Sequence, residues 1–412
     1  MTESKSLEGQ PHTAQGDRAL PLAGVTVIDL SHVYNGPYAT FMMAMAGARV
    51  IKVEPLGGEH LRSRGDSGGA AMAFAMLNSN KESLTLNLKS EDGKEILRRL
   101  VAQADVLVEN FAPGVMERLG LGADALLAAN PRLVYAASSG YGKDGPYRNY
   151  PAMDLVMQAM SGVIAITGYP DQPPVKSGPA VCDFAAGTHL YGAIVTALFD
   201  RERTRRGRVV EVAMQDAIYS SMASNIGMYF ASGGKGPTRT GNRHGGLGIS
   251  PYNVYATNDG YIVLNCPGDH HFRAALEVMG RTDLKDDPRY ATRSARVENM
   301  FEVDDLVEAW TRNFPKQEVA DRLLAAGVPC APVRELGEVM NDANMLVRGS
   351  LQRIEHPDLG EVTLPHSPMR YEGSALRAIE PSHRLGADNT ALLGELGYSA
   401  DQAEALREQG VI

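Results

Sequence analysis

The sequence predicts an α/β protein with two parts: a large domain on an open, mostly parallel sheet, and a smaller α+β domain. Three observations predict this fold class. Short β-branched runs alternate with helical stretches up to about residue 142, which is typical of a parallel sheet covered by helices on both faces. Beyond about residue 225, glycine-rich segments and a hairpin pattern replace this alternation. The chain of 412 residues is also too long for one ordinary core.

The first strand–helix–strand unit lies near the N-terminus. "GVTVIDLSH" (24–32) is a β-branched run, "YATFMMAMAGA" (38–48) is a helical stretch, and "RVIKVEP" (49–55) is a second strand. Two strands joined by one helix within about thirty residues form a βαβ unit, whose strands are parallel. The sequence therefore places the start of the parallel sheet here.

The same pattern continues along the chain. We expect strands at 83–88, 105–110 and 132–142, and a helix at 90–104. "YNVYATNDGYIVLNC" (252–266) predicts a hairpin that turns at Asn258-Asp259-Gly260. Residues 268–330 have helical periodicity. We therefore divide the chain into a mobile tail (1–20), a large domain (21–224), a small domain (225–330), and a linker that returns to the large domain (331–412).

Composition excludes several classes of partner. The net charge of −9 and the pI near 5.6 give no basic surface for nucleic acid. The cysteines Cys182, Cys266 and Cys330 are far apart, so we expect no disulfide framework and no zinc site, which fits a cytoplasmic protein. No window approaches eighteen uninterrupted apolar residues, so we expect no membrane span.

Familiar catalytic motifs are absent or misleading. "GDSGG" (65–69) matches the nucleophile pentapeptide of chymotrypsin-like proteases, but those proteins are all-β and rich in disulfides. We interpret the match as chance. The chain has no G-x-G-x-x-G after its first strand, no G-x-x-x-x-G-K-[ST] and no H-E-x-x-H. We therefore expect no metal and no tightly bound cofactor.

Asp183 is the most conspicuous candidate for chemistry. It is the single acid in "KSGPAVCDFAAGTHLYGAIVTALF" (176–199) and precedes a long apolar helical pattern. It occupies the place of an N-cap, so capping is at least as well supported as catalysis. A carboxylate with a pKa of about 4 is already ionised at neutral pH, so it needs no partner base to act as a nucleophile.

Two further segments carry candidate residues. Asp154 lies in an apolar, methionine-rich stretch, where a hydrogen-bonded structural acid is slightly favoured over a catalytic one. The loop "GNRHGGLGIS" (241–250) contains Gly245 and Gly246 and offers consecutive amides that can bind an oxyanion. A flexible linker is an equally good interpretation of this loop.

Together, several segments give the chain a resemblance to a known family. They occur in this order: "GVTVIDLSHVYNGPYATFMMAMAGARVIKVEP", "NSNKESLTLNLKSEDGKEIL", "ADVLVENFAPGVMERLGLG", "NPRLVYAASSGYGKDGPY", "SGPAVCDFAAGTHLYGAIVTAL" and "GRVVEVAMQDA". The chain resembles the class III coenzyme A transferases, the family of formyl-CoA transferase and the carnitine CoA transferase. The likeness runs from residue 20 to the C-terminus.

The resemblance implies a Rossmann-like large domain, a small domain and an interlocked homodimer. It implies CoA transfer through aspartyl mixed-anhydride and aspartyl-CoA thioester intermediates, with Asp183 as the nucleophile. Asp154 matches a glutamate near the reacting acyl group, and Gly245 and Gly246 match the family's glycine-rich loop. Two departures are Leu247 within that loop and Pro55 where some relatives have an arginine. The matching CoA contacts are His32, Val33, Leu86, Lys89, Asn110, Phe111 and Arg118.

Two other functions remain open on the sequence. The α-methylacyl-CoA racemases of the same superfamily use a His–Asp pair, but here "PAMDLV" (151–156) lacks the histidine. A non-catalytic acyl-CoA-binding protein is the other alternative. Arg243 and His244, or Lys143 and Arg148, can meet a second anionic group, which suggests succinyl-CoA or another short dicarboxylyl-CoA as donor.

Overall fold

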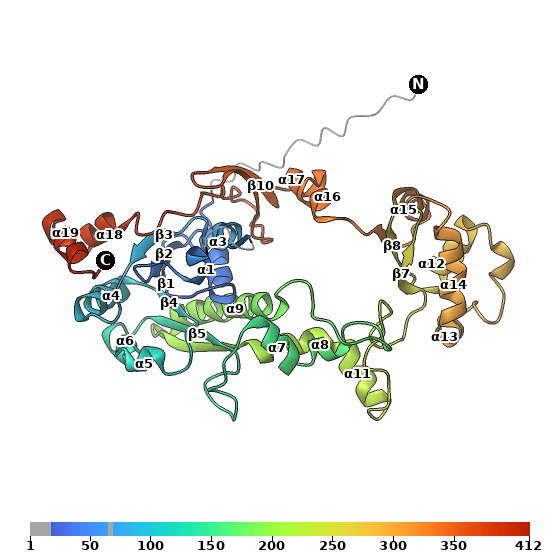
Figure 1. Ribbon diagram of the computed structural model, residues 1–412, viewed down its shortest axis with the longest axis horizontal. Coiled ribbons are helices and arrows are strands. Elements are labelled where there is room, and N and C mark those ends of the chain that lie inside the picture. The colour runs from blue at the N-terminus through green and yellow to red at the C-terminus, as the bar shows by residue number, and fades with distance from the viewer. Residues whose placement is uncertain (1–17, 65–68) are drawn as a thin grey trace, which may run out of the picture. The chain divides into compact units, whose positions relative to one another are not determined.

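Six parallel strands form the main sheet, in the order β3-β2-β1-β4-β5-β6 (Figure 1). This confirms the predicted α/β class with an open parallel sheet. The order is that of a Rossmann sheet, in which the chain runs outward from β1 in one direction and from β4 in the other. The strands are β1 (Thr26–Asp29), β2 (Arg49–Glu54), β3 (Glu82–Thr85), β4 (Val106–Glu109), β5 (Val134–Ser139) and β6 (Arg208–Ala213).

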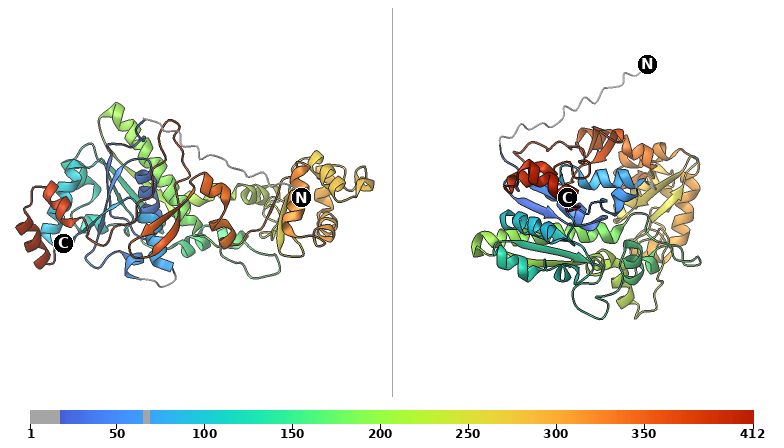
Figure 2. Two further views of the ribbon diagram at one scale, coloured as in Figure 1. Left: turned by 90° about the horizontal axis from the view of Figure 1, so that it is seen from above. Right: turned by 60° about the vertical axis from the view of Figure 1, so that its left-hand side comes forward.

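Helices cover both faces of this sheet because alternate side chains of its strands point to opposite sides. Val27 of β1 packs in one core with α1 (Asn35–Met45) and α9 (Val181–Thr204). Its neighbour Ile28 packs in the other core with α4 (Glu91–Gln103) and α6 (Ala123–Ala129). Figure 2 shows these layers from two further directions. The C-terminal helices α18 (Asn389–Glu395) and α19 (Ala400–Glu408) join the second core.

The computed structural model describes residues 18–64 and 69–412, and they form two compact units. The first unit contains the described residues up to Met157, together with Ala180–Ile218 and Met340–Ile412. It also contains the hairpin of β10 (Leu351–His356) and β11 (Gly360–Pro365). Other helices that begin in it are α2 (His60–Ser63), α3 (Ala70–Asn78), α5 (Val115–Arg118), α7 (Asp154–Met160), α10 (Met214–Tyr219) and α17 (Ala343–Val347).

The second unit contains Gln158–Pro179 and Tyr219–Val339. Its antiparallel sheet pairs β7 (Tyr252–Ala256) with β8 (Tyr261–Asn265), which confirms the predicted hairpin. The third strand is β9 (Cys330–Pro332). Its helices are α8 (Val163–Ile166), α11 (Ala223–Ala231), α12 (Asp269–Val278), α13 (Arg293–Glu298), α14 (Met300–Thr311), α15 (Lys316–Ala325) and α16 (Leu336–Met340), with short 3-10 turns at Ser220–Met222 and Thr282–Leu284.

The compact units divide the chain differently from the predicted domains at three places. Residues 158–179, 219–224 and 331–339 all belong to the second unit. We predicted the first two ranges in the large domain and the third in the linker; as domain boundaries, our divisions stay a prediction. Most of the predicted N-terminal tail, and residues 65–68 of "GDSGG", lie outside the described residues.

Helix α9 is the long apolar helix of the first unit. By length and composition it is, among the described helices, the one that could cross a membrane. Its Leu190, Ile194 and Ala197 are buried in the core that it shares with α1 and the sheet. Its apolar composition is therefore explained by its place as a core helix.

Gly187 sets how closely α9 and the start of α1 approach each other. A Cβ atom there would lie 2.5 Å from the carbonyl oxygen of Asn35 and 3.2 Å from the Tyr38 ring. Gly187 is four residues after Asp183, and residues at this spacing share one face of a helix. The glycine therefore lets the start of α1 lie against the face of α9 that carries Asp183.

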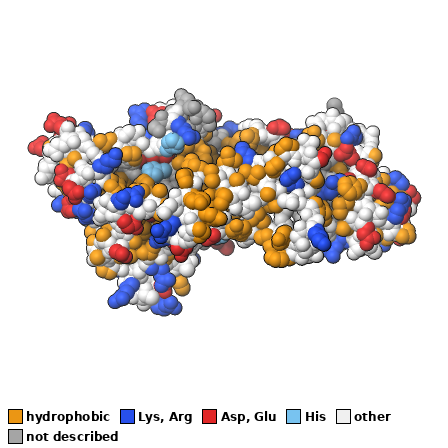
Figure 3. All heavy atoms as spheres, turned by 60° about the horizontal axis from the view of Figure 1, so that its bottom comes forward, with side chains coloured by type: hydrophobic (Ala, Val, Ile, Leu, Met, Phe, Trp, Pro, Cys, Tyr) orange, Lys and Arg blue, Asp and Glu red, His pale blue; other side chains and the backbone are white. Residues whose placement is uncertain are grey.

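Large hydrophobic side chains are also exposed in each unit. Phe199 on α9 is 80% exposed and Leu155 on α7 is 54% exposed, both in the first unit. In the second unit, Phe230 on α11 is 75% exposed. The space-filling view shows many hydrophobic side chains on one face (Figure 3).

Gly187→Ala should destabilise the first unit by about 1–3 kcal/mol, because the added methyl group meets backbone rather than a flexible side chain. Gly192→Ala on the same helix is the matched control. A Cβ atom at Gly192 meets nothing within 4 Å, so that change should stabilise the helix by up to about 1 kcal/mol. Thermal unfolding of both variants measures the difference. Equal midpoints would show that Gly187 does not control this packing.

Candidate active site

A cavity of about 190 Å³ lies at the edge of the sheet where β1 and β4 end. Strand order reverses between these two strands, and ligands of open α/β sheets bind at this kind of position. Among the described residues, Asp183 is the only carboxylate that lines the cavity. The wall also contains His32, Val33, Asn35, Asn110, Phe111, Ser138, Ser139, Gly140, Tyr141, Arg148, Tyr150 and Met214.

Asp183 lies in the first turn of α9, but it does not cap the helix. The helix begins at Val181, so Asp183 is its third residue, and Ala180 at the N-cap position makes no side-chain bond. Asp154 caps the helix from outside: its Oδ1 accepts the N–H groups of Cys182 at 2.9 Å and of Asp183 at 3.2 Å. The predicted N-cap role of Asp183 is therefore wrong, because another segment already satisfies these donors.

The carboxylate of Asp183 is poorly solvated. The residue is 8% exposed, and no described residue donates a hydrogen bond to its side chain. Burial raises the pKa of Asp183 to about 7, and the negative charge of Asp154 contributes. The sequence-based expectation of an ordinary pKa is therefore corrected. Above pH 7 the group is an ion without hydrogen-bonded partners in the described chain, a state that favours nucleophilic attack.

The segment after β1 forms one wall of the cavity and is held by Asn110. The Asn110 side chain accepts the His32 N–H at 2.8 Å and donates to the His32 carbonyl at 2.9 Å and to Asn35 Oδ1 at 2.8 Å. Val33, between them, has a φ of 64°, which is rare for a β-branched residue. The carboxylate of Glu59 accepts its N–H at 3.3 Å. Strained residues held in this way are concentrated at functional sites.

A cluster of buried charged side chains lies at the end of β1, next to this segment. Lys81 Nζ donates to Asp29 Oδ2 at 2.9 Å and to Thr40 Oγ1 at 2.8 Å. Lys52 Nζ lies 3.9 Å from the same carboxylate and donates to the Ser31 carbonyl. Burial alone would raise the pKa of Asp29, but the two ammonium groups hold it below its usual range. The cluster therefore fixes the end of β1 with paired charges.

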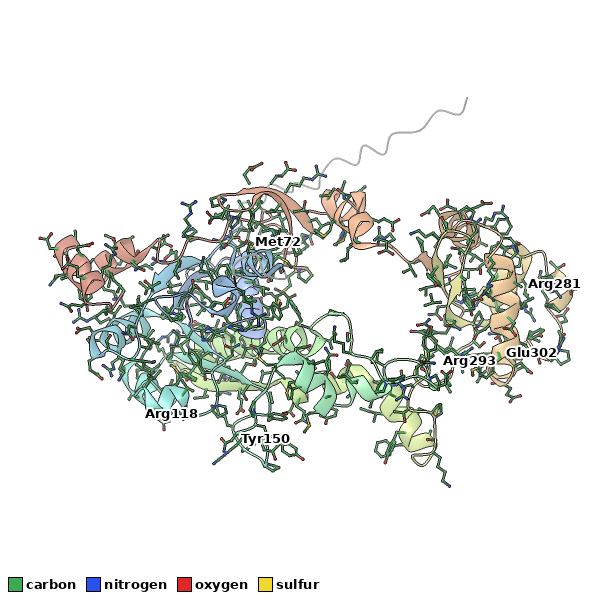
Figure 4. The ribbon with its side chains drawn as sticks, viewed as in Figure 1. Met72, Arg118, Tyr150, Arg281, Arg293 and Glu302 are labelled. Carbon is green, nitrogen blue, oxygen red and sulfur yellow. The ribbon has the colours of Figure 1, made fainter. Side chains whose placement is uncertain are left out.

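The cavity brings together four of the predicted CoA contacts and leaves out three. His32, Val33, Asn110 and Phe111 line it, and the His32 and Phe111 rings pack edge to face with centroids 4.9 Å apart. Leu86, Lys89 and Arg118 do not line it. The Leu86 side chain is buried in the core beneath β3, Lys89 is exposed, and Arg118 ends α5 (Figure 4).

The glycine-rich loop lies in the second unit and is folded on His244. The Nδ1 atom of His244 accepts the N–H groups of Gly246 at 3.2 Å and Gly248 at 3.4 Å. The backbone carbonyl of His244 accepts the N–H of Leu247 at 2.8 Å. Our expectation that this run offers consecutive free amides is therefore wrong for the conformation seen. Among the amides of 245–248, the N–H of Gly245 donates no hydrogen bond within the described chain.

Arg243, beside this loop, is also occupied. Its Nε donates to Asp304 Oδ2 at 2.7 Å, and the guanidinium lies 4.4 Å from the centre of the Phe301 ring. Tyr255 donates to the other oxygen of Asp304 at 2.7 Å. Of the cations that we considered for a second anionic group, Arg243 is therefore committed to the core of its own unit.

Comparison with known proteins identifies the chain. Residues 22–389 match the family described as CoA-transferase family III. The chain belongs to this family. It is 36% identical to a formyl-CoA:oxalate CoA-transferase of Streptomyces avermitilis, over 95% of this chain and 99% of that protein. It is 34% identical to a succinate–glutarate CoA-transferase of Agrobacterium fabrum, over 93% and 98%.

A solved structure carries the same fold. A CaiB/BaiF family protein from Brucella suis superposes with a TM-score of 0.81 at 34% identity, covering 92% of this chain and all of the other. This CoA-transferase is therefore an enzyme of class III that uses CoA thioesters as substrates. Within 18–64 and 69–412, no group of three His, Cys, Asp or Glu side chains is placed to hold a metal.

Sequence reasoning did not single out several residues at the site of this CoA-transferase. Asn35, Ser138 and Ser139 line the cavity. Asn35 is the first residue of α1, and Ser138 and Ser139 are polar residues at the end of the buried strand β5. The sequence could have indicated the two serines, because the ends of parallel strands meet at one edge of the sheet. Glu109 ends β4 and lines an adjoining cavity of about 300 Å³, and burial raises its pKa to about 7.

The raised pKa of Asp183 predicts an effect on stability that does not depend on catalysis. Because the folded pKa of about 7 lies above the ordinary value of 3.8, the folded state holds the proton more tightly, and stability falls as pH rises from about 4 to above 7. Asp183→Asn removes this loss. The variant should exceed the wild type at about pH 8 by up to about 4 kcal/mol, and should match it near about pH 4. Thermal unfolding at both pH values measures this.

Asp154→Asn is the matched comparison. The amide keeps an oxygen that can accept the N–H groups of Cys182 and Asp183, but it carries no charge. The pH dependence should therefore shrink in this variant, since one of the two causes of the raised pKa is gone. A stability difference between Asp183→Asn and wild type that is the same at both pH values would contradict the raised pKa.

Proposed function

We propose that the chain transfers CoA from an acyl-CoA donor to a small carboxylic acid through covalent catalysis by Asp183. The observation that carries this proposal is the lone, buried carboxylate in the cavity between β1 and β4. Among the described residues no side chain or amide donates to it. A carboxylate in this state is a nucleophile that needs no adjacent base.

The reaction runs through two kinds of intermediate. A carboxylate oxygen of Asp183 attacks the thioester carbon, the C–S bond breaks, and CoA leaves as a thiolate, which gives a mixed anhydride. The thiolate attacks Cγ of Asp183 and releases the donor acid, leaving an aspartyl-CoA thioester. The acceptor carboxylate then attacks this thioester and expels CoA thiolate, which attacks the acceptor acyl carbon and frees Asp183. Exclusion of water protects both intermediates from hydrolysis.

Other residues position these groups. Asp154 fixes the first turn of α9, and with it the backbone of Asp183, so we propose a positioning role for it. We propose that His32, Val33, Asn110 and Phe111, which line the cavity, contact the thioester end of CoA. We assign Leu86, Lys89 and Arg118 to the rest of CoA on the resemblance alone. On the same ground, Gly245 and Gly246 are proposed to bind a substrate oxygen once the loop leaves His244.

We propose a short dicarboxylic acid, such as succinate, as one of the two acids exchanged. The two relatives described above are named for oxalate and for succinate and glutarate, which are all dicarboxylic acids. Succinyl-CoA or another short dicarboxylyl-CoA is then the donor when the reaction runs in the opposite direction.

We also propose that the protein is a homodimer, as the resemblance implies. The exposed Phe199, Leu155 and Phe230 are large apolar side chains of the kind that subunit interfaces cover. Sedimentation equilibrium should give about twice the mass of the 44.3 kDa chain. A monomer at micromolar concentration would contradict this proposal.

Asp183→Ala should abolish CoA exchange, with a loss of more than about 1,000-fold, because the described wall of the cavity holds no second carboxylate to form the covalent intermediates. Isotope exchange between a labelled acid and its acyl-CoA measures turnover. Intact mass spectrometry of the wild type should show an acyl-CoA-dependent adduct, which hydroxylamine converts to a hydroxamate at Asp183. Asp216→Asn, an exposed acid on α10, is the control and should retain full activity.

The outcomes separate the alternatives. Activity of Asp183→Ala within tenfold of the wild type, about 1.4 kcal/mol, would refute the assignment. Binding of acyl-CoA with neither adduct nor exchange would indicate a binding protein. Incorporation of deuterium at the α-carbon of a 2-methylacyl-CoA would indicate a racemase.

A further inference from the structure

The charges that line the Asp183 cavity are few. Arg148 is the only Arg or Lys that residues 18–64 and 69–412 contribute to its wall. His32 does not add a second cation, because burial and then the charge of Lys52 lower its pKa to about 4. Within the described chain, the Arg148 guanidinium makes no ion pair. An anion that enters this cavity therefore meets one permanent positive charge.

Arg148 also belongs to the wall between two cavities. The adjoining cavity of about 300 Å³ shares Arg148, Phe111 and Ser138 with the first. Its other charged residues are mainly acids: Glu109, Glu117 and Glu211. The carboxylate of Glu211 already accepts the backbone N–H of Lys143, the one further cation in this wall.

Tyrosine rings lie around the same wall. Tyr141, Tyr147 and Tyr150 pack on one another with centroids 5.1 to 6.0 Å apart, and Tyr141 and Tyr150 line the first cavity with Arg148. Tyr150 lies on the loop that follows β5 (Figure 4). Tyr147 is 40% and Tyr150 is 54% exposed, and Arg148 between them in the sequence is exposed as well. The guanidinium is therefore open to an anion that enters the cavity, and a bound carboxylate would gain mainly from paired hydrogen bonds.

We propose that Arg148 determines specificity by binding the second carboxylate of a short dicarboxylic acid while the first carboxylate reacts at Asp183. This inference rests on the proposed CoA transfer. The planar guanidinium can hold a carboxylate through two parallel hydrogen bonds. The acids beyond Arg148 repel a carboxylate that reaches further, so the site favours short diacids over long ones.

Arg148→Gln tests the inference, with succinate and butyrate as acceptors of equal carbon number. The donor is whichever of formyl-, acetyl- or succinyl-CoA turns over fastest in the wild type. We expect kcat/KM for succinate to fall by about 10- to 100-fold, the range of one charge-assisted interaction, and that for butyrate to change by less than about threefold. Arg148→Lys keeps the charge and should recover part of the loss.

Two matched variants test the geometry. Lys143→Gln alters a cation that lines only the second cavity and should leave the preference for succinate unchanged. Glu117→Gln removes one of the acids beyond Arg148 and should improve adipate relative to succinate, by about threefold or more. Thermal unfolding should confirm that Arg148→Gln and both of these variants fold like the wild type.

Several results would overturn the inference. An equal loss for succinate and butyrate, with a raised KM for the acyl-CoA, would show that Arg148 binds CoA or the reacting carboxylate. An unchanged kcat/KM for succinate would show that Arg148 does not bind the second carboxylate. In both cases, an Asp183 adduct in Arg148→Gln would show that the proposed function still holds. A wild type that forms no adduct would refute the proposed function and the inference together.

Discussion

The first turn of α9 has no cap of its own, and the carboxylate of Asp154 supplies one. These hydrogen bonds tie the start of α7 to the helix that carries Asp183. They hold the backbone of the nucleophile in place, and they also set a negative charge beside it. The same contacts therefore fix the position of Asp183 and help to raise its pKa, so geometry and reactivity are controlled by one neighbour.

The opposite wall depends on the sheet. The reversal of strand order between β1 and β4 leaves an opening at their ends, and the paired charges of Asp29, Lys52 and Lys81 are buried next to the end of β1. The Asn110 side chain forms two hydrogen bonds with the backbone of His32, the residue before Val33. Gly187 then allows the start of α1, which follows Val33, to lie against α9. Between these two walls lies a small cavity, and Asp183 and Arg148 are the charged side chains that the described residues contribute to its lining.

Much of the fold was predictable because apolar periodicity reports local structure directly. The strands around 26–29, 49–54 and 106–109 and the hairpin at 252–265 all follow from β-branched runs and turn residues. Asp183 was identifiable as an isolated acid at the start of an apolar helix. Its N-cap role was wrong because a cap can come from a residue distant in sequence, and Asp154 lies 29 positions away. The glycine loop was misread for a similar reason, since the His244 side chain occupies its amides.

The sequence by itself determined the class of fold, the family and the residue most suited to be the nucleophile, because these depend on local patterns and on the order of segments along the chain. Only the tertiary structure decided which polar residues share a cavity, how strongly burial alters Asp183, and which cations remain unpaired. Solvation and charge depend on what surrounds a group in space. Residues 32, 110, 148 and 183 are brought to one cavity by the sheet, and no local pattern states that they meet.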